Sequence, residues 1–183
     1  FVGVGTNGTI KALDNQSVHE IGLQLMFCNT YHLLLQPGTS IVKQAGGLHS
    51  FINRSLPIIT DSGGFQVFSL AYGSISDELK GKGTKKSQAG HVVKISEEGV
   101  IFRSYRDGKK ILLTPESSIE AQKDLGADII IPLDELPPYH IEKKSLEDSL
   151  DRTHRWEERS LNTHLKNPRN QAMYAVIHGG IDA

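Results

Sequence analysis

Three short stretches of the sequence combine ionisable side chains with glycines, and the first is residues 60–66, Thr-Asp-Ser-Gly-Gly-Phe-Gln. Asp61 follows an apolar run, and the two glycines after it would let the backbone approach a ligand closely and offer free N–H groups. Phe65 could stack on a flat heterocycle. A turn from strand to loop, with Asp61 or the adjacent serine capping a helix, would explain the spacing equally well. The composition of the whole heptad favours a binding site.

Asp134 follows the apolar run of residues 129–133. An ionised carboxylate at the mouth of such a strand needs a partner. It could cap a helix or belong to a buried ion pair, and these structural roles are as well supported as a functional one. In the functional interpretation the carboxylate accepts hydrogen bonds from two adjacent N–H donors. Guanine presents such a pair on its Watson–Crick edge, where a ring N–H lies beside an exocyclic amine.

The third stretch is His178-Gly179-Gly180, which ends the apolar run of residues 173–177. A single histidine is more often structural, but this one could donate a hydrogen bond to a ligand carbonyl through whichever ring nitrogen is protonated. The 8 histidines form neither His-x-x-Glu-His nor His-Glu-x-x-His. Because Cys28 is the single cysteine, the sequence predicts no metal site within this chain.

Apolar periodicity and turn residues predict extended segments that alternate with helices. Short apolar or extended segments are expected at residues 1–5, 26–28, 57–60, 129–133 and 173–177. Helices are expected at residues 18–25, at residues 40–44 before two glycines, and from Thr114-Pro115-Glu116, where Thr114 suits the N-cap. A long helix would carry one stripe of Leu146, Leu150, Thr153 and Trp156. Residues 92–113 are β-rich, with a hairpin turn at Asp107-Gly108.

This alternation is typical of an α/β fold with a mostly parallel sheet. Asp61, Asp134 and His178 would each follow a separate strand, at the strand ends where α/β barrels carry their catalytic residues. An eight-stranded barrel usually needs about 250 residues, so a chain of 183 residues is expected to be part of one. The predicted fold is an incomplete TIM-type (β/α)8 barrel with an inserted antiparallel β segment. Residues 1–183 would belong to one domain, and residues 72–90 would form a flexible insertion.

Bulk composition is ordinary for a globular protein, with 38% hydrophobic and 22% charged residues. The net charge of -1 gives no sign of nucleic-acid binding. A solvated insertion explains the densest basic segment better than an RNA-contacting loop does. That segment contains Lys80, Lys82, Lys85 and Lys86. No segment reads as a signal peptide or reaches the roughly 18 to 20 apolar residues of a membrane span, and a single cysteine suits a reducing cytosol. A cytoplasmic protein is expected.

Together these stretches resemble the queuine tRNA-ribosyltransferase family, also called tRNA-guanine transglycosylases. The resemblance runs in collinear order over nearly the whole chain. It rests on residues 4–9, 29–33, 36–38, 45–49, 60–70, 99–104, 107–108, 114–117, 134–135 and 178–180. The most specific block is Asp-Ser-Gly-Gly-Phe-Gln at residues 61–66.

The resemblance implies an enzyme of queuosine biosynthesis that exchanges guanine at the wobble position of tRNAs with G-U-N anticodons for a 7-deazaguanine base. A carboxylate attacks the ribose anomeric carbon, guanine leaves, and the incoming base displaces the covalent intermediate. The family also implies a structural zinc bound by three Cys and one His, and commonly a homodimer. The nucleophilic Asp and the zinc ligands would lie beyond residue 183. The chain alone is therefore expected to bind no zinc and to turn over no tRNA.

Site roles follow from the same resemblance. Asp61 matches the acid that accepts a proton and contacts the base, and Asp134 matches the carboxylate that grips the guanine-like edge. The rest of the base pocket matches Ser62, Gly63, Gly64 and Phe65, of which the phenylalanine stacks on the purine. The last stretch matches His178, Gly179 and Gly180, with His178 where many members have Gln.

Departures from the family pattern bear on the choice of base. Bacterial-type members usually have Cys after the Asp-Glu pair, whereas this chain has Leu136, and eukaryotic-type members that accept the larger queuine also have an aliphatic residue there. Together with His178, this predicts a preference for queuine over 7-aminomethyl-7-deazaguanine. Pro132 is unusual for a central strand because it removes a ladder donor. Residues 72–88 are longer than this connection usually is in the family.

Two other readings stay open. A non-catalytic accessory subunit would keep the barrel but lose catalytic residues, and the presence of Asp61, Phe65 and Asp134 argues against it. An archaeal-type transglycosylase would make a different deazaguanine and carry further RNA-binding domains.

Overall fold

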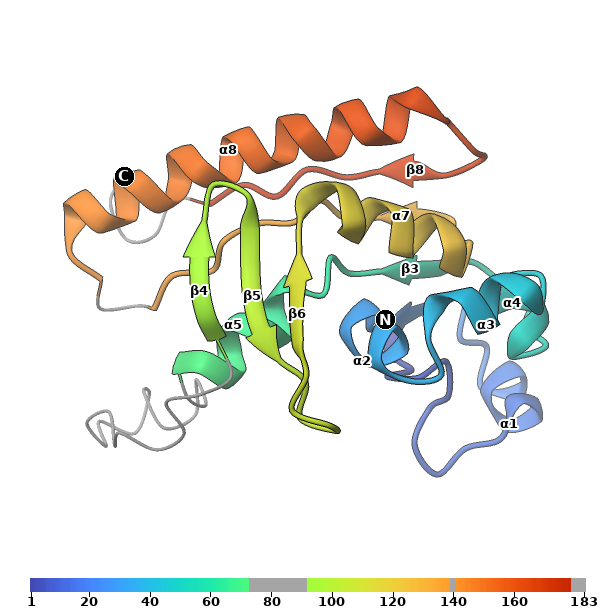
Figure 1. The fold of residues 1–183 in the computed structure, drawn as a ribbon. Helices are drawn as coiled ribbons and strands as arrows, with labels where there is room; N and C mark the ends of the chain where they lie inside the picture. The colour runs from blue at the N-terminus through green and yellow to red at the C-terminus, as the bar shows by residue number, and fades with distance from the viewer. Residues whose placement is uncertain (73–91, 139–140, 179–183) are drawn as a thin grey trace.

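The computed structural model describes residues 1–72, 92–138 and 141–178, which form two sheets and the helices around them (Figure 1). The parallel sheet consists of β1 (Val2–Val4), β2 (Leu25–Cys28), β3 (Ile58–Thr60), β7 (Ile129–Ile130) and β8 (Ala172–Met173). The antiparallel sheet consists of β4 (Val92–Ser96), β5 (Gly99–Arg103) and β6 (Lys110–Leu113). The helices are α1 (Asn15–Glu20), α2 (Thr30–Leu35), α3 (Thr39–Gln44), α4 (Leu48–Phe51), α5 (Gly64–Tyr72), α7 (Pro115–Leu125) and α8 (Lys143–Lys166).

The parallel sheet has the strand order β1-β2-β3-β7-β8, so each new strand joins the same growing edge as the chain proceeds. Every neighbouring pair in it is parallel. The antiparallel sheet interrupts this progression between β3 and β7 in the chain, where residues 92–113 had the β-rich pattern. The predicted α/β class with a parallel sheet is confirmed, whereas closure into an eight-stranded barrel stays a prediction. The predicted flexible insertion at residues 72–90 lies almost wholly outside the described residues.

The strands β7 and β8 are shorter than the sequence predicted. The apolar run at residues 129–133 is a strand only over its first two residues, and residues 173–177 are a strand only at Met173. Beyond β7, the backbone N–H and oxygen of Ile131 pair with the side chain of Gln122, at 2.9 and 2.7 Å, instead of with a neighbouring strand. Pro132 therefore lies outside the hydrogen-bonded ladder, which explains why a proline is tolerated there.

Local capping signals account for where two helices begin and end. The Thr114 side chain accepts a hydrogen bond from the N–H of Ser117, and the serine reciprocates, so α7 begins at the predicted capping residue. The helix predicted at residues 18–25 was misplaced: α1 begins earlier because Asp14 caps it, and it ends before Gly22, whose φ of 72° breaks the helix. The short helices α2, α4 and α5 were not predicted.

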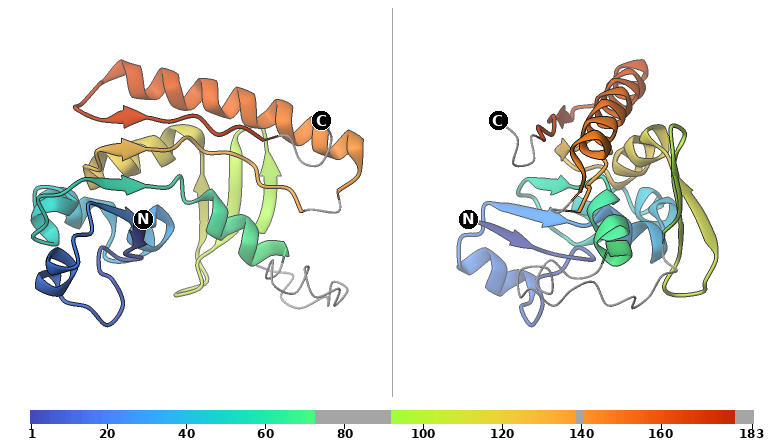
Figure 2. Two further views of the ribbon diagram at one scale, coloured as in Figure 1. Left: turned by 180° about the vertical axis from the view of Figure 1, so that it is seen from behind. Right: turned by 90° about the vertical axis from the view of Figure 1, so that its left-hand side faces the viewer.

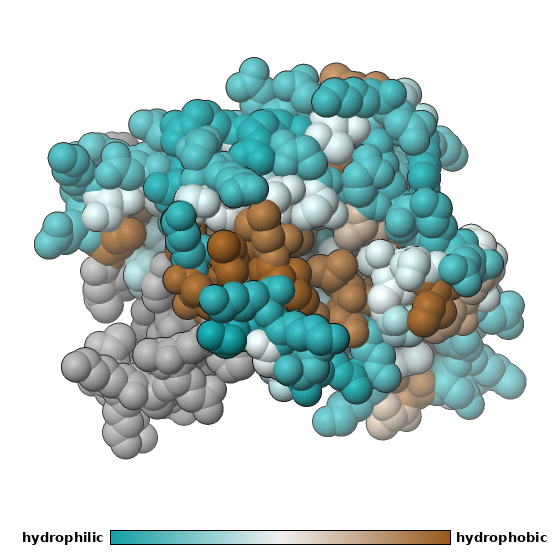
Figure 3. All heavy atoms as spheres, in the orientation of Figure 1, coloured by the Kyte–Doolittle hydropathy of each residue, from teal (hydrophilic) through white to brown (hydrophobic). Residues whose placement is uncertain are grey.

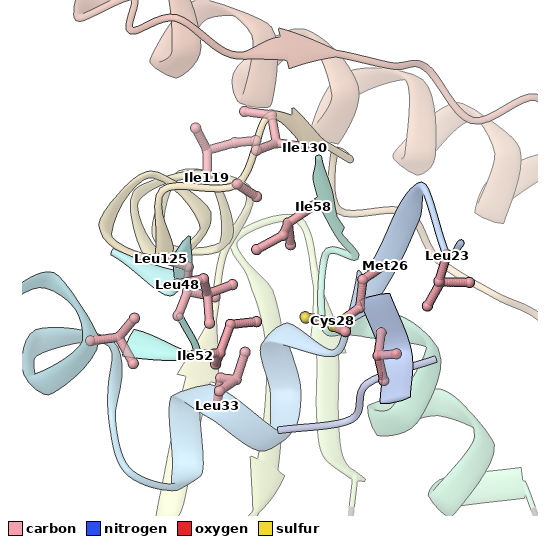
Figure 4. Packing of buried hydrophobic residues seen from close by; sticks show 13 residues of the cluster. Leu23, Met26, Cys28, Leu33, Leu48, Ile52, Ile58, Ile119, Leu125 and Ile130 are labelled. Atoms are coloured by element: carbon pink, nitrogen blue, oxygen red, sulfur yellow. The ribbon is translucent and has the colours of Figure 1, made fainter. Parts of the chain in front are cut away.

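The core has two parts. The first, shown in Figure 4, fills the space between the parallel sheet and helices α2, α3, α4 and α7. Its labelled members include Met26, Leu33, Leu48, Ile58, Leu125 and Ile130. The second joins the antiparallel sheet to α5 and α8 through Tyr31, Phe68, Phe102, Leu133 and Trp156, among others. Because Leu133 belongs to this second cluster, the segment that follows β7 is packed against the rest of the molecule.

Helix α8 runs alongside α7 and β8 (Figure 2). Its predicted apolar stripe is partly confirmed: Thr153 and Trp156 are buried, whereas Leu146 and Leu150 are half-buried. The Trp156 indole N–H donates to the backbone oxygen of Glu97, in the turn between β4 and β5, at 2.9 Å. The helix thereby joins the antiparallel sheet to the segment that follows β7.

Apolar side chains gather over the outward face of the antiparallel sheet (Figure 3). Val93 of β4 and Leu112 of β6 are 44% and 39% exposed. Among the described residues, no helix combines the length and apolar character that a membrane span requires.

A buried lysine ties α7 to the C-terminal end of α8. Lys123 is fully buried, and its Nζ donates hydrogen bonds of 3.0–3.2 Å to the backbone oxygens of Thr163, His164 and Asn167. Replacing Lys123 by Met in the full-length protein should lower the free energy of unfolding by about 3 kcal/mol, because these helix-end oxygens would lose their donor. Urea denaturation measures this. Lys43→Met is the matched control, since exposed Lys43 pairs with Asp124 and should change stability by about 0.5 kcal/mol or less. Equal losses in the two variants would contradict the assignment.

Candidate active site

Asp61 lies directly after β3, and four N–H groups surround its carboxylate. One oxygen, Oδ1, accepts from the backbone N–H of Thr30 at 2.7 Å and from that of Gly63 at 3.2 Å. The other, Oδ2, accepts from the side-chain amides of Asn29 at 2.8 Å and Gln66 at 3.2 Å. The side chain therefore has a single orientation, held from the start of α2 and from the residues that follow β3.

The electrostatics of Asp61 are set by two opposing effects. The residue is only 8% exposed, and burial raises the pKa of its carboxyl above the ordinary value. The hydrogen bonds from Asn29, Thr30, Gln66 and Gly63 lower this pKa, although less than burial raises it. A carboxylate whose pKa is raised in this way is a stronger base than a free aspartate, which suits a group that accepts a proton.

The loop after Asp61 packs tightly on two sides. Gly63 has a φ of 83°, and a Cβ there would lie 3.3 Å from the backbone nitrogen of Tyr31. A Cβ on Gly64 would lie 2.9 Å from the Leu133 side chain and 3.3 Å from the backbone oxygen of Asp134. The two glycines thus allow the loop after β3 to touch both the start of α2 and the segment after β7.

Ser62 and Phe65 differ in how accessible they are. Ser62 is buried, and its Oγ accepts from the backbone N–H of Gly64 at 3.1 Å, so its hydroxyl shapes the turn. Phe65 is 49% exposed at the start of α5. An exposed ring beside two strand ends is available to stack on a flat ligand.

Asp134 lies at the C-terminal end of the β7 segment, beyond the short strand itself. Its neighbour Glu135 anchors this segment to α8: the Glu135 N–H donates to Thr153 Oγ1 at 3.0 Å, and the Glu135 carboxylate pairs with Arg152. Leu136 is half-buried against the second core cluster. The position of Asp134 is therefore fixed from both sides in the chain.

Two buried side chains of α7 hold the segments after β3 and β7 together. Ser118 Oγ donates to the backbone oxygen of Ser62 at 2.7 Å. Gln122 accepts from Thr60 Oγ1 at 3.0 Å, and its side chain also bonds with both the backbone N–H and the backbone oxygen of Ile131. Since residues four apart on a helix share a face, one turn of α7 sets the spacing of the two segments.

His178 completes the group from the segment after β8. Its Nε2 lies 2.7 Å from Asp134 Oδ2, and the two side chains are 19% and 17% exposed. The hydrogen bond to Asp134, together with the negative charges of Asp134 and Glu157, raises the pKa of His178, and burial opposes this. The segment before His178 is held by Glu157 of α8, whose Oε1 accepts from the N–H of Val176 at 2.7 Å.

The structure thus brings Asp61, Asp134 and His178 to one edge of the sheet, because β3, β7 and β8 are neighbours and run in parallel. Only Asp61 directly follows its strand. The other two predicted site residues of the last stretch, Gly179 and Gly180, lie outside the described residues. At this edge, the Asp61 carboxylate is buried and accepts four N–H groups, whereas the Asp134–His178 pair is partly exposed and the Phe65 ring is about half exposed.

Sequence reasoning did not identify Asn29 and Thr30 as site residues. Both hold Asp61, and Thr30 Oγ1 also donates to the Asp61 backbone oxygen at 2.6 Å. The available signal was their position: they follow the apolar residues of β2, which is the parallel neighbour of β3.

Within the described parts of the chain, no three His, Cys, Asp or Glu side chains are grouped closely enough to hold a metal ion. Cys28 is fully buried, and burial raises the pKa of its thiol to about 12. This thiol is therefore protonated at neutral pH and unsuited to metal binding.

Comparison with known proteins gives concordant matches. Residues 1–183 match the model of the family described as "Queuine tRNA-ribosyltransferase". A protein of that name from Protochlamydia amoebophila is 79% identical over 182 residues, which are 100% of this chain and 47% of the relative. Another from Chlamydia caviae is 58% identical over 182 residues, again 100% of this chain, and 48% of the relative. The chain thus spans about half the length of these curated relatives.

Proposed function

Because this chain belongs to the queuine tRNA-ribosyltransferase family, we propose that the full-length protein exchanges guanine at the tRNA wobble position for a 7-deazaguanine base. Its substrates would be tRNAs with G-U-N anticodons. The relatives' shared name supports both the tRNA and a queuine-type base.

One observation carries this proposal: the three strand ends that hold Asp61, Asp134 and His178 are neighbours in one parallel sheet. In the proposed site, the Asp134 carboxylate accepts the ring N–H and exocyclic amine of the base. Phe65 stacks on the flat ring. Asp61, held by four N–H groups, faces the ring system as a base of raised pKa.

The proposed reaction has two displacements. A carboxylate of the full-length protein, outside residues 1–183, forms a bond to the ribose anomeric carbon while the bond from that carbon to guanine breaks. Guanine leaves with the electron pair of that bond, and its freed ring nitrogen takes up a proton from solvent. The incoming base then forms its own bond to this carbon through a ring nitrogen, and the carboxylate leaves with its electron pair. Asp61 accepts the proton that this nitrogen loses.

The remaining expectations from the family are proposals for the full-length protein. Strand order that follows chain order supports a β/α barrel. The structural zinc would need other ligands, since Cys28 is buried with a protonated thiol and the residues described here do not fit it. A homodimer follows from the resemblance alone, and a cytoplasmic location from the sequence features described above.

Incorporation of labelled guanine into tRNA tests the proposed function. The full-length protein should label a tRNA with a G-U-N anticodon and should leave unlabelled a tRNA in which the wobble guanine is replaced by adenine. If a folded full-length protein labelled neither tRNA, the accessory-subunit reading would replace this one.

Leu136 leads to a prediction about the base. The full-length protein should use queuine at least about tenfold more efficiently than 7-aminomethyl-7-deazaguanine, because a half-buried aliphatic wall suits the bulkier substituent. Leu136→Cys should narrow this ratio. Competition of the two bases against labelled guanine in tRNA measures it, and a preference for the aminomethyl base would contradict the prediction.

A further inference from the structure

The turn between β5 and β6 combines positive charge with an exposed aromatic ring. Residues 103–110, Arg-Ser-Tyr-Arg-Asp-Gly-Lys-Lys, carry four cationic side chains and one acidic one, in a chain whose net charge is -1. All of these residues except Ser104 are exposed. The turn projects beyond the end of the antiparallel sheet (Figure 1). An aromatic residue among cations is typical of a surface that binds single-stranded nucleic acid.

Contacts within the turn fix its shape. The N–H of buried Ser104 donates to the backbone oxygen of Lys109 at 2.9 Å, and Ser104 Oγ accepts from the N–H of Arg106 at 3.2 Å. Asp107, the acid of the turn, pairs with Lys109 at 3.2 Å. Arg106 makes no ion pair with any residue that the structure describes. Its charge is therefore available to an anionic partner.

Tyr105 connects this turn to the residues that hold Asp61. Its ring stacks on that of Tyr31, with centroids 6.1 Å apart and planes inclined by 29°, and it meets the ring of His32 edge-on. Tyr31 directly follows Thr30, whose N–H donates to Asp61. Burial lowers the pKa of His32, and the negative charge of Asp61 opposes this. Tyr105 thus lies beside the proposed base site, and 52% of it is exposed.

The antiparallel sheet stands at the edge of the parallel sheet where the site lies. Its last strand, β6, leads directly into α7, and Ser118 near the start of α7 binds the backbone oxygen of Ser62, just after β3. In α/β barrels the substrate is bound at this edge, where the strands end. An RNA that brings its reacting base to Asp61 therefore meets the β5–β6 turn with the nucleotides around that base.

We propose that the β5–β6 turn is an RNA-contacting surface, in which Tyr105 stacks on an unpaired base of the anticodon loop and Arg106 binds a phosphate of that loop. This inference rests on the proposed function and extends it from the exchanged base to the surrounding RNA. The anticodon loop is single-stranded, so its bases are free to stack on an aromatic ring. The guanidinium fork of an arginine matches two oxygens of one phosphate.

Fluorescence anisotropy of a fluorescent anticodon stem-loop RNA, titrated with the full-length protein at several salt concentrations, tests the phosphate contact. Arg106→Ala should bind the RNA more weakly, and its plot of log affinity against log salt should be shallower by about 0.7–0.9, the contribution of one phosphate contact. Arg106→Lys should keep the wild-type slope. Lys166→Ala is the matched control and should keep both affinity and slope. Lys166 is exposed at the C-terminal end of α8, which packs against the end of α7 rather than its start.

The stacking contact has its own test. Tyr105→Ala should weaken RNA binding about 5- to 150-fold, the loss expected for one base–aromatic stack, whereas Tyr105→Phe keeps the ring and should stay within about twofold of the wild type. In guanine exchange the loss should raise the KM for tRNA and not the KM for guanine. An equal rise in both would show that the variant disturbs Tyr31 and the Asp61 site, and would contradict the stacking role.

The outcomes separate this inference from the proposed function. If the wild type exchanges guanine in tRNA but Arg106→Ala keeps wild-type RNA affinity and salt slope, the surface is wrongly assigned and the proposed function stands. If the wild type neither binds the RNA nor exchanges guanine, both fail. Because Arg106 is exposed, its variant decides the question even if Tyr105→Ala does not fold.

Discussion

Asp61→Asn in the full-length protein should lower the turnover number for guanine exchange by about 10²- to 10⁴-fold, the usual contribution of a positioned general base. Asparagine has nearly the shape of aspartate but cannot take a proton from the incoming base. The surrounding N–H groups hold the side chain at position 61 in a single orientation. The one oxygen that asparagine keeps therefore cannot turn to replace the carboxylate oxygen that is lost. Incorporation of labelled guanine into tRNA under saturating base measures the effect.

The same substitution also has a structural cost, which needs a control. The amide nitrogen of an asparagine at position 61 would face an N–H donor in a buried place, costing about 1–3 kcal/mol of stability. Asp128→Asn is the matched control. Asp128 Oδ2 accepts from the N–H of Ile58 at 2.7 Å and pairs with His49. This contact lies where β3 and β7 begin, at the opposite end of these strands from Asp61. The control variant should lose stability and keep its turnover number. If both variants lost turnover equally, the cause would be damage to the sheet, and the role of Asp61 as the base would be refuted.

Asp134→Asn should weaken guanine binding by about 10²-fold or more, because an amide N–H would replace a carboxylate oxygen opposite the N–H donors of the base. Loss of one charged hydrogen bond of about 1.5–3 kcal/mol, together with an unpaired donor, gives an effect of this size. The loss should appear in the dissociation constant and in the KM for the base. Asp61→Asn, in contrast, should act mainly on turnover.

Titration calorimetry with guanine measures the Asp134 effect directly, and Asp128→Asn serves again as the control. An Asp134→Asn protein that bound guanine with wild-type affinity would rule out this carboxylate as the partner of the base.

Local chemistry in the sequence determined several elements correctly. The Thr-Pro-Glu start of α7 was predictable because its capping box involves residues only three apart. The strand β3 and its terminal Asp61 were predictable because a short apolar run ends abruptly in a charged residue. The specific heptad at residues 60–66 also carried the family resemblance, which the match over residues 1–183 confirms.

Tertiary structure decided how far the strands extend. The apolar run after Asp128 has one hydrophobic pattern throughout, yet only Ile129 and Ile130 pair with neighbouring strands. Beyond them, Gln122 of α7 replaces the partner strand. Pro132 is a signal within the run that the ladder ends early, but no pattern in the run shows that a side chain of α7 takes the place of the partner strand.

Tertiary structure also decided which residues share the site. The donors that hold Asp61 from the start of α2 lie 31 and 32 residues away in the chain, and His178 lies 44 residues from Asp134. Residue types and spacing determined that these side chains could do chemistry, because polar groups at strand ends are a local signal. Their contacts depend on which strands become neighbours in the sheet, and that depends on long-range packing, which no local sequence pattern encodes.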